Sequence, residues 1–191
     1  MRELQIRELT LADLPTLSQI NATFTSNTTL RVERKERGVN LTWKLQETRL
    51  EKPFDRGNGY DLGAQDLSDI RRWLEKGQGL HLLVLDGYRP VALLNVEPQN
   101  WNRTAFIWNI LVDKEYRQQG LGKALIERAI AWARENKFRA LCLETQTNNM
   151  PAIGFYRHLG FRLTGIREDF YSNRDIERGE VAIFFSYRLD Q

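Results

Sequence analysis

The sequence is poor in the residues that build metal and disulfide sites. Its 191 residues include one cysteine, Cys142, and two histidines that lie far apart, His81 and His158. A lone cysteine cannot form an internal disulfide, and two distant histidines provide no cluster at metal-ligand spacing. We therefore expect neither a disulfide framework nor a bound metal. Cys142 is expected to be a small buried side chain in a strand rather than a nucleophile.

Long apolar runs are missing as well. The longest run, residues 105–112, is interrupted by Asn109 and is far shorter than the roughly 20 residues of a membrane-spanning helix. The opening Met1-Arg2-Glu3-Leu4-Gln5 carries charges where a secretory signal needs an apolar stretch. We therefore expect no membrane partner and a cytoplasmic location.

The sequence also lacks a strong excess of either positive or negative charge. The chain has 28 Lys and Arg against 25 Asp and Glu, a formal net charge of +3, and the charges are interspersed. Such a weak excess suits an anionic small ligand and argues against a nucleic-acid partner. The length, with 41% hydrophobic residues, suits one globular domain over residues 1–191.

Hydrophobic periodicity predicts an alternation of strands and helices. A strand or hairpin is expected over residues 28–49 and a loop over 53–63. Strand, helix and strand follow one another over residues 104–144, which predicts a right-handed crossover between parallel strands. The fold class is therefore α/β, a mixed sheet with helices on both faces. The remaining expected strands are 4–7, 80–85, 90–97, 161–171 and 181–189, and the helices are 10–20, 66–76, 121–137 and 150–159.

Two glycines stand at the start of the helix expected over residues 121–137. Without Cβ atoms, Gly120 and Gly122 let the backbone close around a ligand, and the free N–H groups of a first helical turn favour an anion. Arg117 and Lys123 add positive charge on either side. Taken alone, the two glycines are equally consistent with a tight turn between strand and helix. The segment matches neither a Walker A loop nor the G-x-G-x-x-G of dinucleotide-binding enzymes.

A second motif lies downstream, where residues 149–161 have the form N-x-x-A-x-x-F-Y-x-x-x-G-F. Together with R-x-x-G-x-G at residues 117–122, it resembles the GNAT superfamily of acetyl-CoA-dependent N-acetyltransferases. The resemblance covers residues 80–189, whereas residues 21–79 have no clear match and are expected to cap the substrate side. Residues 100–103 and 143–149 further resemble the streptothricin acetyltransferase branch.

The resemblance implies a single N-acetyltransferase domain with a mostly antiparallel sheet and a V-shaped splay between two central parallel strands. It implies that the pantetheine arm of acetyl-CoA follows the main chain of Ile110, Leu111 and Val112. Asn149 is expected to contact the cofactor and also to cap its own helix. The pyrophosphate is expected on the backbone amides of Gln118, Gln119, Gly120, Leu121, Gly122 and Lys123, with Arg117 nearby. These seven residues are called the glycine loop.

The implied reaction is attack of a neutral amine on the thioester, which requires a base or a water relay near pH 7. Glu144 matches a catalytic glutamate of N-terminal protein acetyltransferases and is the expected base; its alternative role is to position the substrate. Tyr156 matches the family tyrosine that protonates the leaving thiolate, with core packing as the alternative. Many relatives carry a glutamate in the strand before the phosphate loop, whereas this chain has Trp108-Asn109.

The expected function is acetylation of the β-lysine amine of streptothricin, which gives antibiotic resistance. One alternative is acetylation of another small polyamine, an aminoglycoside or a protein N-terminal amine, and another is a non-catalytic module that senses acetyl-CoA. The partner is a small-molecule amine, and both a monomer and a homodimer stay open. A polycationic acceptor needs further carboxylates, for which Glu97, Glu168 and Asp169 are the candidates.

Overall fold

The computed structural model describes residues 4–57 and 62–189. Two compact units make up the chain: residues 1–23, 57–143 and 187–191 form the first, and residues 24–56 and 144–186 form the second. Strand β7 (Ala140–Gln146) begins in the first unit and ends in the second. Within the described ranges, no helix is both long and apolar enough to span a membrane.

The first unit is built on a largely antiparallel sheet, as predicted. Its strands lie in the order β1, β4, β5, β6 and β7. The β4–β5 connection is a tight hairpin in which Gly87 has φ +60°, a conformation that favours glycine. The strand bounds are β1 (Leu4–Glu8), β4 (Leu80–Asp86), β5 (Arg89–Gln99) and β6 (Thr104–Val112).

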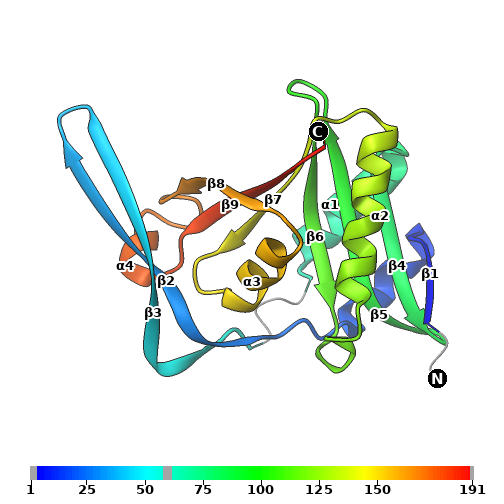
Figure 1. Cartoon of the computed structure of the whole chain (residues 1–191). Coiled ribbons are helices and arrows are strands. Elements are labelled where there is room, and N and C mark those ends of the chain that lie inside the picture. Colours follow the sequence, from blue (N-terminus) through cyan, green and yellow to red (C-terminus); the bar gives the residue numbers. More distant parts are fainter. Residues whose placement is uncertain (1–3, 58–61, 190–191) are drawn as a thin grey trace. The chain divides into compact units, whose positions relative to one another are not determined.

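Helices cover both faces of this sheet (Figure 1). On one face, η1 (Leu11–Gln19) and α1 (Ala64–Lys76) share a core with Leu83, Leu93 and Leu111. On the other face, α2 (Leu121–Glu135) packs against β4, β5 and β6. Side chains alternate between the two faces of a strand, so the continuous apolar run of β4 is buried on both.

The crossover predicted over residues 104–144 is confirmed. Strands β6 and β7 pair in parallel from Thr104 and Ala140 to Ile107 and Leu143, and β6 then continues to Val112. The register between β5 and β6 shifts where β6 passes from Ile107 to Asn109, which makes a bulge at Trp108. Beyond this bulge, β6 extends outside its ladder with β7.

The second unit contains a long hairpin and a pair of antiparallel strands. Of the two alternatives expected over residues 28–49, a strand or a hairpin, the structure has the hairpin. It is formed by β2 (Thr25–Arg37) and β3 (Asn40–Asp55), which turn at Gly38, where φ is +63°. Strand β8 pairs with β9. The other elements are α3 (Met150–His158), β8 (Arg162–Arg167), α4 (Asp175–Arg178) and β9 (Ala182–Arg188).

Two expectations about local structure were wrong. The strand expected over 161–171 ends at Arg167, and helix α4, which is too short for a helical period, was not predicted. The loop expected over 53–63 begins later, because β3 extends to Asp55 and pairs there with Thr25; residues 58–61 of that loop lie outside the described ranges. The helix expected over 10–20 is confirmed over Leu11–Gln19, where it is of the 3-10 type.

Candidate functional site

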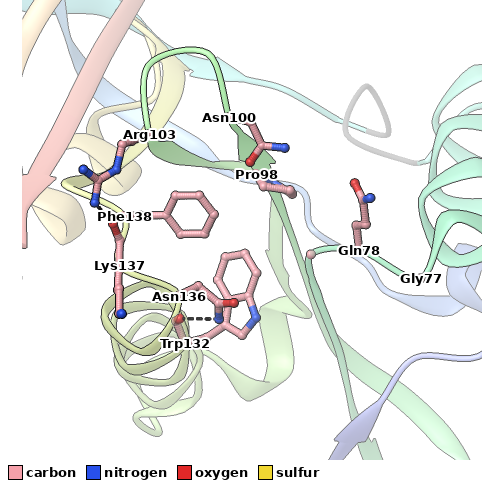
Figure 2. A pocket seen from close by; sticks show the side chains of 10 residues that line it. Gly77, Gln78, Pro98, Asn100, Arg103, Trp132, Asn136, Lys137 and Phe138 are labelled. Atoms are coloured by element: carbon pink, nitrogen blue, oxygen red, sulfur yellow. Dashed lines mark hydrogen bonds between the residues drawn. The ribbon is translucent and has the colours of Figure 1, made fainter.

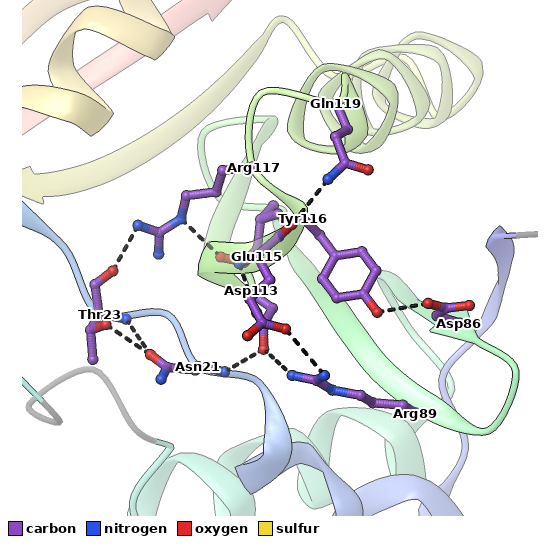
Figure 3. Close-up of polar contacts among 10 residues, drawn as sticks. Asn21, Thr23, Asp86, Arg89, Asp113, Glu115, Tyr116, Arg117 and Gln119 are labelled. Carbon is purple, nitrogen blue, oxygen red and sulfur yellow. Dashed lines mark hydrogen bonds and ion pairs between the residues drawn. The ribbon is translucent and has the colours of Figure 1, made fainter. Parts of the chain in front are cut away.

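The segment between β6 and α2 is anchored by Asp113, a fully buried carboxylate of the first unit (Figure 3). Its Oδ2 accepts hydrogen bonds from the backbone N–H of Asn21 at 3.0 Å and from Arg89 at 3.1 Å. Its Oδ1 accepts the backbone N–H of Glu115 at 3.0 Å, at the start of η2 (Lys114–Tyr116). One side chain therefore ties the start of the glycine loop to β5 and to the segment after η1.

Arg117 is held by the protein's own backbone. Its Nε donates to the carbonyl of Val112 at 3.1 Å, and its Nη1 donates to the carbonyl of Thr23 at 2.7 Å. Burial lowers the pKa of the guanidinium from its usual value, while Asp113 acts to raise it. Arg117 therefore shapes the entrance of the loop through these two hydrogen bonds.

The loop reaches α2 through left-handed backbone conformations. Gln118 has φ +60° and Gly120 has φ +84°, and α2 begins at Leu121. A Cβ on Gly120 would meet no atom within 4 Å, so the backbone conformation, not lack of space, favours glycine here. The N–H groups of Leu121, Gly122 and Lys123 have no partner within their helix. This end of α2 therefore suits an anionic group.

The residues expected to bind pantetheine lie just before the loop. Ile110, Leu111 and Val112 pair on one side with β5. The parallel ladder on the other side has already ended, at Ile107 and Leu143. Main-chain groups in this half of β6 are therefore placed as an extended ligand would need them.

In the second unit, Glu144 is hydrogen-bonded to Tyr171. The hydroxyl of Tyr171 donates to Oε1 of Glu144. Burial raises the pKa of Glu144 to about 7; the hydrogen bond from Tyr171 acts to lower it and the nearby charge of Glu180 to raise it. A carboxyl group with a pKa near neutrality is matched to proton transfer at physiological pH.

Asp175 positions Tyr171. This carboxylate is 1% exposed, and it accepts the backbone N–H groups of Phe170 and Tyr171, both at 2.9 Å. It also accepts the hydroxyl of Ser172 at 2.7 Å. Our sequence analysis missed Tyr171, because we placed it in a strand. The signal that could have found the turn is Ser172-x-x-Asp175, a spacing typical of capping turns.

The predicted motif residues of α3 occupy the start and the middle of that helix. Asn149 caps it, as expected, by accepting the N–H of Ala152 at 3.2 Å. Tyr156 is 7% exposed, and its ring packs against Phe161 and Phe185. The second unit thus holds Glu144, Asn149 and Tyr156, whereas the first holds residues 110–112 and 117–123.

Two of the carboxylates expected to bind a polycation, Glu168 and Asp169, already have partners. Glu168 accepts Nε1 of Trp43 at 3.0 Å and pairs with Arg34 at 2.8 Å, so it fastens the hairpin within the second unit. Asp169 pairs with Arg167 at 3.0 Å. In the first unit, the Glu97 side chain is 13% exposed and lies beside His81.

A pocket of about 590 Å³ lies elsewhere in the first unit, at the C-terminal end of α2 (Figure 2). The rings of Trp132 and Phe138 lie on one side of it, with centroids 5.4 Å apart. Gln78 lines it from the turn before β4, Pro98 from the end of β5 and Asn100 from the turn after β5. None of the predicted catalytic or cofactor-binding residues lines this pocket.

The sequence profile of the acetyltransferase (GNAT) family matches residues 42–161. The chain belongs to this family. The match begins within the segment that our sequence analysis left unmatched, so the family pattern reaches into β3. The GNAT enzyme is an acetyl-CoA-dependent N-acetyltransferase.

Individual relatives cover most of this GNAT chain. Streptothricin acetyltransferase A of Bacillus subtilis is 35% identical over 150 residues, which is 78% of this chain and 82% of the relative. The crystal structure of a nourseothricin acetyltransferase aligns with a TM-score of 0.79 at 25% identity, over 97% of this chain and 98% of the other. A putative streptothricin acetyltransferase from Bacillus anthracis, solved in complex with acetyl coenzyme A, aligns with a TM-score of 0.74 at 27% identity, over 97% and 99% of the two chains.

Proposed function

We propose that this enzyme acetylates the β-lysine amine of streptothricin in the cytoplasm and thereby confers resistance to the antibiotic. The observation that carries the proposal is the 35% identity to streptothricin acetyltransferase A, which spans 78% of this chain rather than a short motif. The two structural alignments, each over 97% of the chain, support the same acceptor.

The first unit supplies the groups that bind acetyl-CoA. The pyrophosphate binds the amides of residues 118–123, supported by the left-handed Gly120 and the start of α2. The pantetheine arm pairs with residues 110–112, where β6 has left its ladder with β7. Arg117 holds the loop in shape through its hydrogen bonds to the carbonyls of Val112 and Thr23. Its positive charge also favours the anionic cofactor. From the second unit, Asn149 contacts the cofactor as well as capping α3.

The second unit supplies the proton-transfer groups. Acetyl-CoA carries the acetyl group as a thioester, and the acceptor amine must lose its proton before it can attack. Glu144 takes that proton, directly or through water, because its raised pKa lets it exchange protons near pH 7. Tyr156 gives a proton to the sulfur as the C–S bond breaks. One proton is taken up, one is delivered, and the products are an amide and the free thiol of coenzyme A.

Resistance in a living cell tests the proposal. A streptothricin-sensitive bacterium that expresses the chain is expected to grow at antibiotic concentrations that stop the same strain with an empty vector. The matched control is Glu144→Gln, which keeps the size of the side chain but cannot take up a proton. Equal growth of the wild type and the Glu144→Gln variant would remove Glu144 from the mechanism, and absence of resistance in both would remove streptothricin.

A further inference from the structure

A row of polar side chains crosses the first unit's sheet where the neighbouring row is apolar. His81 of β4 lies opposite Asn95 of β5, and Asn95 lies opposite Asn109 of β6. Two residues along, Leu83, Leu93 and Leu111 occupy the equivalent row in the core beneath α1. Burying amide and imidazole groups is unfavourable unless each is hydrogen-bonded. The polar row therefore calls for an explanation beyond packing.

Hydrogen bonds connect the side chains of this row, and all of them donate in the same direction, from Asn109 towards Gln78. Nδ2 of Asn109 donates to Oδ1 of Asn95 at 3.1 Å, and Nδ2 of Asn95 lies 3.0 Å from Nδ1 of His81. Nε2 of His81 lies 2.9 Å from the carbonyl of Gln78. Because a carbonyl can only accept, Nε2 carries the imidazole proton and Nδ1 accepts from Asn95. The amide oxygen of Asn109 is then the end of this row of hydrogen bonds and points away from Asn95.

The two ends of this row of hydrogen bonds, Asn109 and His81, differ in their surroundings. Asn95 is fully buried, but Asn109 is only partly buried and lies in the half of β6 beyond its ladder with β7. The bulge at Trp108 brings Asn109 into register with Asn95. At the other end, Gln78, whose carbonyl lies 2.9 Å from Nε2 of His81, lines the pocket of Figure 2.

We infer that Asn109 is a positioning residue for the acceptor amine, and that His81 and Asn95 fix which end of its amide faces the site. With His81 neutral, Asn109 presents an oxygen, which can accept a hydrogen bond from the amine. With His81 protonated, Nδ1 becomes a donor, so Asn95 and then Asn109 must both rotate, and Asn109 presents its NH₂ group instead. The inference rests on the proposed function in one respect, namely that residues 110–112 line the site.

The groups around His81 favour the neutral form at physiological pH. Burial, which includes stacking against Trp73 of α1, lowers the pKa of His81, although the hydrogen bond to the carbonyl of Gln78 acts to raise it. Glu97 of β5 approaches Nε2 at 3.2 Å, and burial raises its pKa to about 7, although Lys76 and Arg72 of α1 act to lower it. The acceptor orientation of Asn109 is therefore present at neutral pH and is lost as the pH falls and His81 takes up a proton.

Nuclear magnetic resonance of the uniformly ¹⁵N-labelled chain tests the linkage without any substrate. We expect the neutral His81 to be protonated at Nε2, and the side-chain amide signals of Asn95 and Asn109 to titrate with the same midpoint as His81. His158, an exposed residue and the other histidine of the chain, is the internal control. Amide signals that stay fixed while His81 titrates would overturn the relay.

Two substitutions at Asn109 separate the relay from a packing role. A carboxylate in Asn109→Asp can only accept from Asn95, so Asn95 must turn its oxygen to His81; the pKa of His81 is then expected to rise. Asn109→Leu keeps the side-chain volume but removes the amide oxygen that accepts a hydrogen bond. The loss of one such hydrogen bond to the substrate amine predicts about a 10- to 100-fold fall in kcat/KM for that amine. Affinity for acetyl-CoA is expected to stay at the wild-type value.

The acceptor used in this assay is whichever amine the purified enzyme acetylates. If that amine is not streptothricin, the proposed function fails while the fall in kcat/KM for Asn109→Leu still tests the positioning role. Unchanged kcat/KM in Asn109→Leu would overturn that role, and an unchanged pKa of His81 in Asn109→Asp would overturn the coupling through Asn95. The exposed variant His158→Gln is expected to match the wild type in each measurement.

Discussion

The hydroxyl of Tyr171 donates a hydrogen bond to Oε1 of Glu144, and Asp175 holds the backbone of Tyr171 in place for it. A carboxylate that is half-buried would by itself bind its proton too tightly for a base at neutral pH. The phenol counteracts this effect, because a hydrogen bond to the ionised form stabilises that form. Burial and the hydrogen bond from Tyr171 therefore together set the pH range in which Glu144 can act.

Tyr171→Phe is expected to move the acid limb of the kcat/KM profile to higher pH. The substitution removes the group that lowers the pKa of Glu144, whose value is about 7 in the intact enzyme, so the base is lost at a higher pH. Steady-state rates measured from roughly pH 5.5 to 9 define the acid limb, because this range brackets the pKa of Glu144. Tyr88→Phe, at a fully exposed tyrosine, is the control. An unshifted limb would show that the contact with Tyr171 does not tune Glu144.

Tyr156→Phe is expected to reduce kcat by about 10² to 10⁴, the range typical of one lost proton-transfer group. The ring that packs against Phe161 and Phe185 is kept, so neither the fold nor the affinity for acetyl-CoA should change. Stopped-flow measurement of thiol release and calorimetry of acetyl-CoA binding separate the two effects. A wild-type kcat would leave Tyr156 with a packing role only.

Gly120→Ala is expected to weaken acetyl-CoA binding. Gly120 and Gly87 both have positive φ, +84° and +60°, and a Cβ on either would meet no atom within 4 Å. Each alanine variant should therefore lose about 1 kcal/mol of stability through backbone strain. Only Gly120→Ala is expected to raise the Kd for acetyl-CoA in calorimetry. Equal Kd values for the two variants would contradict the assignment of the loop.

Asp113→Ala is expected to lower the free energy of unfolding by about 3 kcal/mol, because it leaves the buried N–H groups of Asn21 and Glu115 without their acceptor. Urea unfolding followed by circular dichroism measures the change. Asp69→Ala is the comparison, since it breaks a surface pair with Arg72 and should lose less than about 1 kcal/mol. Similar losses in both variants would show that Asp113 does not anchor the loop.

Local patterns predicted the parts of the fold that depend on neighbouring residues. The meander from β4 to β6 followed from apolar strands and from Asp86-Gly87, whose glycine adopts the expected left-handed turn. The cap at Asn149 followed from its place before Pro151. These features need only a few consecutive residues, so a single sequence contains their signal.

Contacts between distant residues could not be predicted in this way. The bond from Asn21 to Asp113 joins positions 92 residues apart, and that from Tyr171 to Glu144 joins positions 27 residues apart. The row of His81, Asn95 and Asn109 depends on the strand register, which the bulge at Trp108 shifts. Tertiary packing fixes a register of this kind, and no local sequence signal for the bulge was recognised.

The identity of the acceptor amine is best tested by kcat/KM values measured over a panel of amines. The purified enzyme is given acetyl-CoA with streptothricin, a linear polyamine, an aminoglycoside or a peptide with a free N-terminus, and release of the coenzyme A thiol is followed. We expect the highest kcat/KM for streptothricin, with one acetyl group on its β-lysine amine by mass spectrometry. A higher value for any other amine, with streptothricin recovered unmodified, would contradict it.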